Sequence, residues 1–340
     1  MILKEEIIKL WRDTFDDTEE FIRFYFDRKY REENTVVAID NEELLAALQM
    51  IPYPMTWLGK EVSASYISGA CTRETARNKG IMRSLLAEAF ITMKNRDIAF
   101  SILIPQEEWL YDYYAKSGYA PVLAYTPGNY YLHGKAKSEG TRMLTAEEWE
   151  AGIKELYHYF DRQMKKRPDC VQHTPEDFRH ILEDLYRSGG KLATVSNPLG
   201  KLTGMAFALP LPDKIAVNEI VYSTEEAHNN LLHAIANEWG KNEIACRYPP
   251  GSGKNSKRGM ARIIDAPQVL SLYAATQPQK SLLLRLTDEA VPSNSGYYRI
   301  TNGKCFNTGP GVGKTDLDLS VAELTRFLFA QPAFVSLMLD

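Results

Sequence analysis

A short basic turn with one glycine is the stretch of this sequence whose residue types and spacing are best suited to chemistry. Its members are Arg77, Asn78, Lys79 and Gly80. Apolar residues then recur at helical spacing from Ile81 to Phe90, which predicts a helix that begins directly after the turn. The first backbone N–H groups of a helix have no intrahelical partner and lie at the positive end of its dipole. With two cationic side chains and a glycine that allows close approach, the turn predicts a site for a phosphate or another anion.

The elements around this turn are those that must hold it in place. Residues 63–72 are small, tolerate extended backbone and contain no proline, so they predict a strand that leads into the turn. Downstream, residues 98–104 predict a buried strand, and residues 109–117 predict a short helix closed by Gly118. A strand, a basic turn and a helix recur in many α/β domains, so a purely structural role for the turn stays open on these grounds alone.

Two short motifs resemble those of the GNAT superfamily of N-acetyltransferases. Residues 77–83 (RNKGIMR) look like its acetyl-CoA pyrophosphate loop, and residues 114–119 (YAKSGY) resemble its Tyr-x-x-x-Gly-aromatic motif. Met82 stands where most GNAT loops carry Gly or Ala. Together with Arg83, it makes the loop similar to that of the Eis (enhanced intracellular survival) family. The resemblance covers the whole chain and is strongest in its first third.

The resemblance implies an α+β fold class, in which two tandem GNAT-like mixed-sheet domains precede a small sterol-carrier-like α+β domain. A charged stretch at residues 134–141 and a polar loop at residues 249–257 supply the two boundaries. We therefore expect an acetyl-CoA-binding catalytic GNAT domain at residues 1–134, a degenerate second GNAT-like domain at 135–256, and a sterol-carrier-like domain at 257–340. The corresponding turn of the second domain is acidic and lacks glycine, so no pyrophosphate site is expected there.

The same resemblance implies an N-acetyltransferase that moves an acetyl group from acetyl-CoA, its acyl-donor substrate, directly to a primary amine. Such a reaction needs a positioned thioester, a neutral amine and a protonated leaving thiolate. Tyr114 occupies the motif position of the general acid. The pantetheine arm is expected to pair as an added strand with the backbone of Ala70, Cys71 and Thr72. The pyrophosphate is expected to bind the side chains of Arg77 and Lys79 and the amides of Asn78, Lys79, Gly80, Ile81 and Met82.

The resemblance also suggests a general base and an acceptor pocket. In the Eis family the C-terminal carboxylate has the role of base, and this chain ends in an apolar tail whose last residue is Asp340. The helices expected within residues 5–30 match those that help to line the acceptor pocket of that family. Their aromatic residues are expected mainly to pack in the core.

Composition sets limits on the other classes of protein. The net charge of -4 argues against a nucleic-acid partner, and no apolar run approaches the ~20 residues that cross a membrane. The N-terminus does not read as a signal peptide. The four cysteines are scattered, without a C-x-x-C pair, which is typical of a reducing cytoplasm. We expect a cytoplasmic protein whose partners are acetyl-CoA and an amine acceptor. The family often forms homo-oligomers, and the sequence gives no subunit number.

The sequence also allows two functions other than that of an enzyme. The chain could be a non-catalytic acyl-CoA or lipid-binding sensor, or a scaffold that binds no cofactor, and both alternatives stay open. The group Cys170, His173 and His180 lacks a fourth ligand nearby, so no metal site is predicted.

Overall fold

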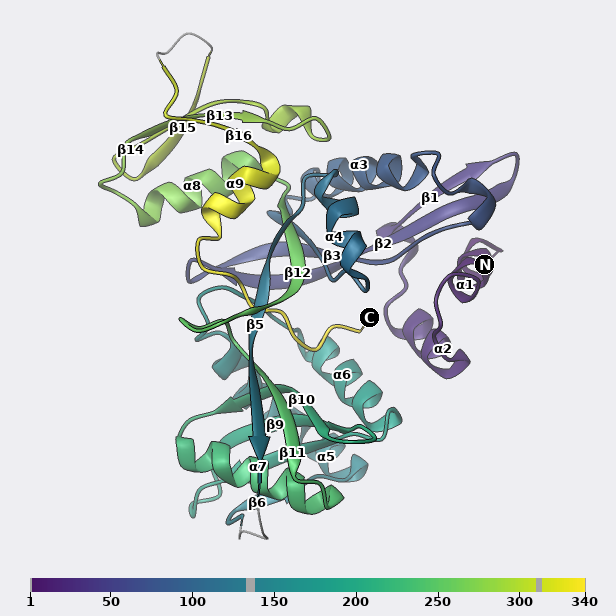
Figure 1. The fold of residues 1–340 in the computed structure, drawn as a ribbon, viewed down its shortest axis with the longest axis vertical. Helices are drawn as coiled ribbons and strands as arrows, with labels where there is room; N and C mark the ends of the chain where they lie inside the picture. Colours follow the sequence, from purple (N-terminus) through teal and green to yellow (C-terminus); the bar gives the residue numbers. More distant parts are fainter. Residues whose placement is uncertain (1, 133–137, 310–313, 340) are drawn as a thin grey trace. The chain divides into compact units, whose positions relative to one another are not determined.

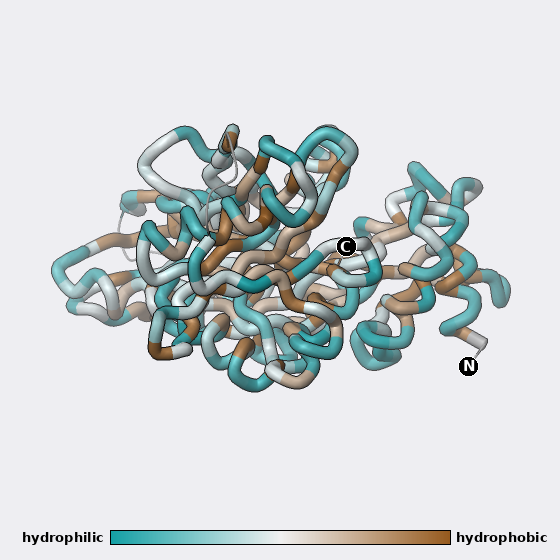
Figure 2. The backbone as a smooth tube through the Cα atoms, turned by 90° about the horizontal axis from the view of Figure 1, so that it is seen from below, coloured by the Kyte–Doolittle hydropathy of each residue, from teal (hydrophilic) through white to brown (hydrophobic). Residues whose placement is uncertain are grey.

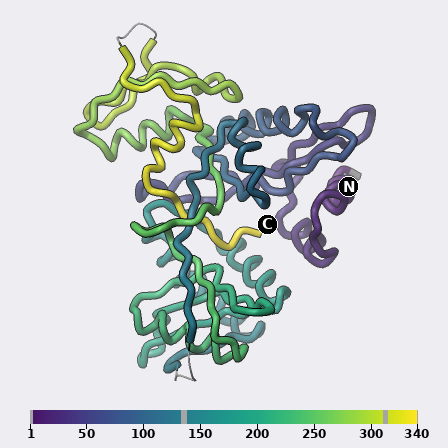
Figure 3. The backbone as a smooth tube through the Cα atoms, in the orientation of Figure 1, coloured from purple at the N-terminus to yellow at the C-terminus, as the bar shows by residue number. Residues whose placement is uncertain are grey.

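The computed structural model describes residues 2–132, 138–309 and 314–339, which form helices and strands throughout (Figure 1). By their internal contacts these residues fall into two compact units, and Figure 3 lets the reader follow the chain through them. Unit 1 holds the described parts of residues 1–123 and 258–332, and unit 2 those of residues 124–257 and 333–339. Both units contain mixed sheets covered by helices, so the α+β fold class with mixed sheets that was expected from the sequence is confirmed.

The large sheet of unit 1 has the strand order β1-β2-β3-β4-β12-β5, of which only the first residues of β5 belong to this unit. The pairs from β1 to β3 are antiparallel, β4 is parallel to β3, and β12 is antiparallel to β4. A parallel pair needs a crossover, and α3 supplies it. The strand bounds are β1 (Thr35–Asp40), β2 (Glu43–Trp57), β3 (Lys60–Thr72), β4 (Phe100–Leu103), β5 (Ala120–Tyr131) and β12 (Ser256–Ile263).

Four α-helices belong to the first 123 residues: α1 (Ile2–Arg12), α2 (Glu19–Arg28), α3 (Ile81–Lys94) and α4 (Glu108–Ala115). Two 3-10 turns, η1 (Glu32–Asn34) and η2 (Glu74–Ala76), precede β1 and α3. The predicted periodicity of α3 is confirmed, because its apolar stripe is buried against the sheet. Hydrophilic and hydrophobic segments alternate along α1 and α2 (Figure 2), whose aromatic rings pack on one another around Trp11.

Unit 1 also contains a smaller sheet of order β15-β14-β13-β16. Its antiparallel meander is completed by β16, which runs parallel to β13. Its elements are α8 (Ala266–Thr276), β13 (Leu282–Thr287), η3 (Pro292–Asn294), β14 (Gly296–Thr301), β15 (Lys304–Thr308), β16 (Leu317–Ser320) and α9 (Val321–Leu328).

A buried ion pair joins the two sheets of unit 1. The side chains of Arg262, on β12, and Asp288, just after β13, are 0% and 1% exposed, and Arg262 Nη2 donates to Asp288 Oδ1 at 2.5 Å. Arg262 Nε also donates to the carbonyl of Ser117 at 2.9 Å. Asp288 accepts further bonds from the Val291 amide and the Asn294 side chain. Every charge of this pair is therefore matched inside the protein.

Unit 2 has the strand order β5-β11-β10-β9-β8-β6. A capping box at Thr145 starts α5, and a second one at Thr174 starts α6. The elements are β6 (Thr141–Met143), α5 (Ala146–Met164), β7 (Cys170–Val171), α6 (Pro175–Arg187), β8 (Lys191–Ser196), β9 (Leu202–Pro210), β10 (Ile215–Tyr222), α7 (Glu225–Trp239) and β11 (Glu243–Tyr248).

The same order of pairing occurs once in each unit. In unit 1, β2 and β3 are antiparallel, α3 crosses over, and β4 is parallel to β3. In unit 2, β9 and β10 are antiparallel, α7 crosses over, and β11 is parallel to β10. The parallel ladder is short in both units: β3 pairs with β4, and β10 with β11, over three residue pairs each. The division at residues 134 and 256 stays a prediction, since part of the first boundary, residues 133–137, lies outside the described residues.

Two strands are not evident from the local sequence. The strand β2 continues in register with β3 through Pro52 and Pro54, although proline usually interrupts a strand. Both prolines lie beyond Gln49, the last residue of β2 that pairs with β1, so they remove no N–H from that ladder. The strand β12 was missed altogether, because its start lies in a polar loop sequence.

Candidate functional site

The strands β3 and β4 part from each other near the middle of the sheet. They pair only from Ala64 with Phe100 to Tyr66 with Ile102, and β4 ends one residue later. The strand β3 runs on to Thr72 and keeps β2 as its partner along the other edge. Among the described residues, the backbone of residues 67–72 therefore has no strand partner on the β4 side. Such a free edge can take an extended ligand as an added strand.

A β-bulge lies at the free edge of β3. Ser68 pairs with Gln49 and Cys71 with Ala47, so Gly69 and Ala70 together face the single residue Leu48. Gly69 has a φ of 58°, which favours glycine. A Cβ atom there would come within 2.1 Å of the Trp11 ring. Only glycine fits the bulge without moving Trp11.

A cavity of about 110 Å³ opens where the two strands part. It is lined by helices α1 and α4, by the end of β3, and by the residues after β4. The side chains and backbone that line it are Trp11, Phe15, Asp17, Tyr66, Ile67, Ser68, Gly69, Ala70, Leu103, Ile104, Pro105, Gln106, Leu110 and Tyr114. The cavity thus brings Ala70 and Tyr114, two of the predicted site residues, to one place.

Tyr114 is held by the short helix α4 and is 9% exposed. Its ring lies edge-on to Tyr113 and Tyr119, with centroids 5.3 and 5.9 Å away. Burial raises the pKa of the Tyr114 phenol above its usual value, and the nearby Tyr113 and Cys71 add to the rise. The phenol is therefore neutral, and able to donate its proton, at neutral and moderately basic pH.

The basic turn follows the end of β3 and lies on the surface. Asn78 and Gly80 have left-handed φ values of 62° and 78°, and Gly80 caps α3 without any side-chain hydrogen bond. The first intrahelical bond runs from the Ser84 amide to the Gly80 carbonyl. The amides of residues 81–83 thus stay free of intrahelical partners, as the sequence predicted. Arg77 Nε donates to the Thr72 carbonyl at 3.1 Å, which ties the turn to the end of β3.

The other predicted site residues differ in how they are placed. The Cys71 side chain is 1% exposed, its thiol lies 3.8 Å from the Ala47 carbonyl, and burial raises its pKa to about 12. It is a packing residue, and only its backbone is at the free edge. The Met82 side chain is likewise in the core. Only the backbone N–H of Met82 is therefore available to a ligand at the first turn of α3. Asp340 lies outside the described residues.

Sequence reasoning did not single out three residues on the α1–α2 side of the cavity. They are Trp11, Phe15 and Asp17, and Trp11 Nε1 donates to Asp17 Oδ2 at 2.8 Å. Nothing local marks Asp17 as a cavity residue, because its place depends on how α1 packs against β3.

The described residues form neither a metal-binding cluster nor a membrane-spanning helix. No group of three His, Cys, Asp or Glu side chains there is arranged to hold a metal ion. Within the described parts of the chain, none of the helices combines the length and the apolar character needed to cross a membrane.

Comparison with known proteins assigns the fold of the first part of the chain. Residues 4–122 match the family model described as an acetyltransferase (GNAT) domain. No curated protein matches the sequence. The family match covers β3, the basic turn, α3 and α4, so the predicted GNAT resemblance is confirmed for this region.

Solved structures resemble the whole chain at low sequence identity. A probable N-acyltransferase of unknown function from Enterococcus faecalis has a TM-score of 0.78 at 16% identity, over 96% of this chain and 88% of its own. A GCN5-related N-acetyltransferase from Anabaena variabilis has a TM-score of 0.73 at 17% identity, over 94% and 86%. Eis1 from Mycobacterium abscessus has a TM-score of 0.70 at 14% identity, over 95% and 86%. The chain therefore shares the fold of these three structures.

Proposed function

We propose that this chain is an acetyl-CoA-dependent N-acetyltransferase whose site lies in unit 1. The observation that carries the proposal is the cavity where β3 and β4 part. It places the free edge of β3 beside the buried phenol of Tyr114, and the same strand leads directly into the glycine-bearing basic turn. The free edge of β3 would bind the pantetheine arm of the cofactor, the Tyr114 phenol would protonate the leaving thiolate, and the basic turn would bind the phosphates.

The cofactor would bind along β3 and the start of α3. The pantetheine amides would pair with the backbone of Ala70, Cys71 and Thr72, at the edge that β4 leaves free. The pyrophosphate would accept hydrogen bonds from amides in residues 78–82, helped by the charges of Arg77 and Lys79. The main chain does most of this binding, so the buried side chains of Cys71 and Met82 are no obstacle to it.

In the proposed reaction a neutral amine attacks the thioester carbonyl carbon. The new C–N bond forms, the C–S bond breaks, and the electron pair of the latter goes to sulfur. Tyr114 gives its proton to that sulfur, and the proton lost by the amine goes to a base or to water. Transfer is direct, because the Cys71 thiol is neutral and buried and so a poor nucleophile.

The cavity suits an acceptor that carries positive charge. Asp17 supplies a carboxylate, and Trp11, Phe15 and Tyr66 supply aromatic rings, a combination that attracts ammonium groups. The acceptor proposed is a primary amine, either a small molecule or a lysine side chain.

The C-terminal carboxylate of Asp340 is proposed as the base that accepts the proton of the amine. Residues 333–339 lie in unit 2, where the Ser336 side chain donates to Glu219 and the Ser336 carbonyl contacts His173 Nε2 at 3.1 Å. These two contacts fix the position of Ser336 within unit 2. The support for Asp340 itself is the family resemblance.

We expect that extending the chain by two glycines after Asp340 lowers kcat at least tenfold, because the terminal carboxylate moves away while Met338 and Leu339 keep their packing. Steady-state kinetics beside acetyl-CoA binding would measure this. The matched control is Asp340→Asn, which changes the side chain and keeps the terminal carboxylate in place. Full activity of the extended chain would rule out the terminal carboxylate as base.

The proposed organisation of the rest of the chain rests on the smaller sheet and on the family resemblance. The smaller sheet of β13–β16 with α8 and α9 supports a separate C-terminal module, and its sterol-carrier-like character rests on the family resemblance. Three domains at residues 1–134, 135–256 and 257–340, a homo-oligomer and a cytoplasmic location are proposed on the same ground.

The direct test of the enzyme is amine-dependent release of the CoA thiol from acetyl-CoA by the purified protein. We expect release with primary amines and none with matched tertiary amines, which cannot lose a proton to form an amide. The alternative, a non-catalytic acyl-CoA or lipid-binding sensor, would bind acetyl-CoA and release no thiol with any amine. That outcome would contradict the proposal.

A further inference from the structure

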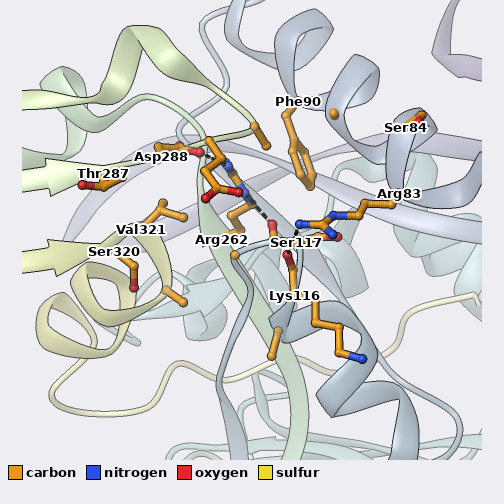
Figure 4. Close-up of a pocket in the computed structure, with 16 residues that line it drawn as sticks. Arg83, Ser84, Phe90, Lys116, Ser117, Arg262, Thr287, Asp288, Ser320 and Val321 are labelled. Atoms are coloured by element: carbon orange, nitrogen blue, oxygen red, sulfur yellow. Dashed lines mark hydrogen bonds and ion pairs between the residues drawn. The ribbon is translucent and has the colours of Figure 1, made fainter. Parts of the chain in front are cut away.

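A second and larger cavity, of about 470 Å³, lies elsewhere in unit 1 (Figure 4). Its walls are α3, the turn after α4, β12, the residues after β13 and the start of α9. It shares no lining residue with the cavity at Tyr114. Its volume is within the range of about 300–1,000 Å³ that is usual for small-molecule sites. The proposed acetyltransferase reaction has no use for it.

The floor of this cavity is rigid and electrically neutral. It is formed by the Arg262–Asp288 ion pair and by the ring of Phe90, whose centroid is 4.2 Å from the Arg262 guanidinium carbon (Figure 4). The Asp288 carboxylate is fully used by its partners, Arg262, Val291 and Asn294. It therefore adds no free negative charge to the cavity.

Hydrogen-bond donors dominate the rest of the lining. Arg83 and Lys116 are exposed cations at its edge, and Arg83 Nη2 donates to the Lys116 carbonyl at 3.5 Å. The Ser117 side chain is 9% exposed and lines the cavity, so its hydroxyl is a further hydrogen-bond donor beside these two cations.

The start of α9 contributes further hydrogen-bond donors to the lining of this cavity. Ser320 caps this helix through a capping box with Glu323, and Val321 and Ala322, whose amides belong to the first turn, line the cavity. A helix N-terminus favours negative charge. The acidic group that remains on the lining is Glu289, which is exposed. Ala87, Ala290 and Val321 provide apolar surface between the polar groups.

We propose that this cavity binds a small organic anion, a phosphate or carboxylate attached to an apolar body. The anionic group would lie between the Ser117 hydroxyl and the start of α9, with the exposed side chain of Lys116 turned inward to meet it, and the apolar body would lie against Ala87 and Ala290. The ligand would touch α3 and the end of α4, the two helices that also frame the proposed cofactor site. The inference stands on this cavity alone and does not depend on acetyl transfer.

The test is calorimetric titration with phenyl phosphate. Phenol and inorganic phosphate, which represent its apolar and its anionic part, are titrated separately for comparison. We expect phenyl phosphate to bind more tightly than either half. Lys116→Gln should weaken it about tenfold, since a charge-assisted hydrogen bond is lost. Ala322→Phe, which fills the cavity from the α9 side, should abolish binding. Arg285→Gln, which removes an exposed cation outside the cavity, is the control and should change nothing.

Three outcomes would overturn the inference. They are no binding of phenyl phosphate by the parent, unchanged affinity in Lys116→Gln, and displacement of phenyl phosphate by acetyl-CoA in one-to-one competition. The last would place the phosphate on the basic turn instead. Because Lys116 is exposed, its variant is expected to fold even if the larger change at Ala322 is not tolerated. If the parent protein binds phenyl phosphate but shows no acetyl transfer, the proposed anion site stands and the proposed acetyltransferase function is rejected.

Discussion

Replacing Tyr114 by phenylalanine is expected to lower kcat by about 10²–10⁴-fold, the usual contribution of a positioned general acid. The change removes one oxygen from a buried ring that packs on Tyr113 and Tyr119, so the fold and the affinity for acetyl-CoA should stay the same. Steady-state kinetics and a cofactor titration on the same protein would separate the two effects. Tyr113→Phe is the matched control, because Tyr113 is adjacent and does not line the cavity.

The pH dependence of the reaction provides a second check on Tyr114. Burial raises the pKa of its phenol, and the acid acts in its protonated form, so activity that depends on Tyr114 persists as pH rises until that raised pKa is reached. The fraction of the acceptor amine in its neutral form rises over the same range, because the pKa of such an amine is about 10. We therefore expect kcat/KM to rise from pH 7 towards ~10. A fall between these values that disappears in Tyr114→Phe would contradict the assignment.

Replacing Asp288 by asparagine is expected to reduce the free energy of unfolding of unit 1 by about 3–5 kcal/mol. The change leaves the Arg262 guanidinium buried without a counter-charge, at a place where both side chains are almost fully shielded from water. The carboxyamide keeps the size of the group, so the loss comes from charge and hydrogen bonding and not from a cavity. Arg262 also holds the Ser117 carbonyl, which extends the damage to the turn after α4.

Urea unfolding monitored by tryptophan fluorescence and circular dichroism would measure this loss. The matched control is Asp318→Asn, which breaks the ion pair of Asp318 with Arg285 at 3.1 Å, where both side chains are at least half exposed. Exposed pairs contribute about 0–1 kcal/mol. Equal losses in the two variants would show that the Arg262–Asp288 pair does not hold the two sheets together.

The parts of the site that depend on local sequence could be predicted. The basic turn, the start of α3 and the position of Tyr114 follow from residue type and from helical periodicity over a few residues, and all of them are found where expected. Gly80 illustrates the reason, because the left-handed φ of the helix cap is a local requirement that glycine meets.

The parts that depend on contacts distant in the sequence could not be predicted. The strand β12 pairs with β4 across more than 150 residues, and its Arg262 finds a partner in Asp288 that no spacing rule connects to it. The Gly69 bulge depends on the place of the Trp11 ring, which is set by helix packing. Asp17 enters the cavity for the same reason. Resemblance to a family suggested where the candidate site lies, and the tertiary structure shows which residues surround that place.

Calorimetric titration with acetyl-CoA of the parent protein and of Gly80→Glu tests the central claim most directly. The substitution places a carboxylate where the phosphates are proposed to bind. Gly59→Glu is the control, since Gly59 has a similar left-handed φ of 69° and, like Gly80, open space around its Cβ position. We predict that the parent and Gly59→Glu bind with similar affinity and that Gly80→Glu does not bind. Equal binding by all three proteins, or none by the parent, would contradict a cofactor site on this turn.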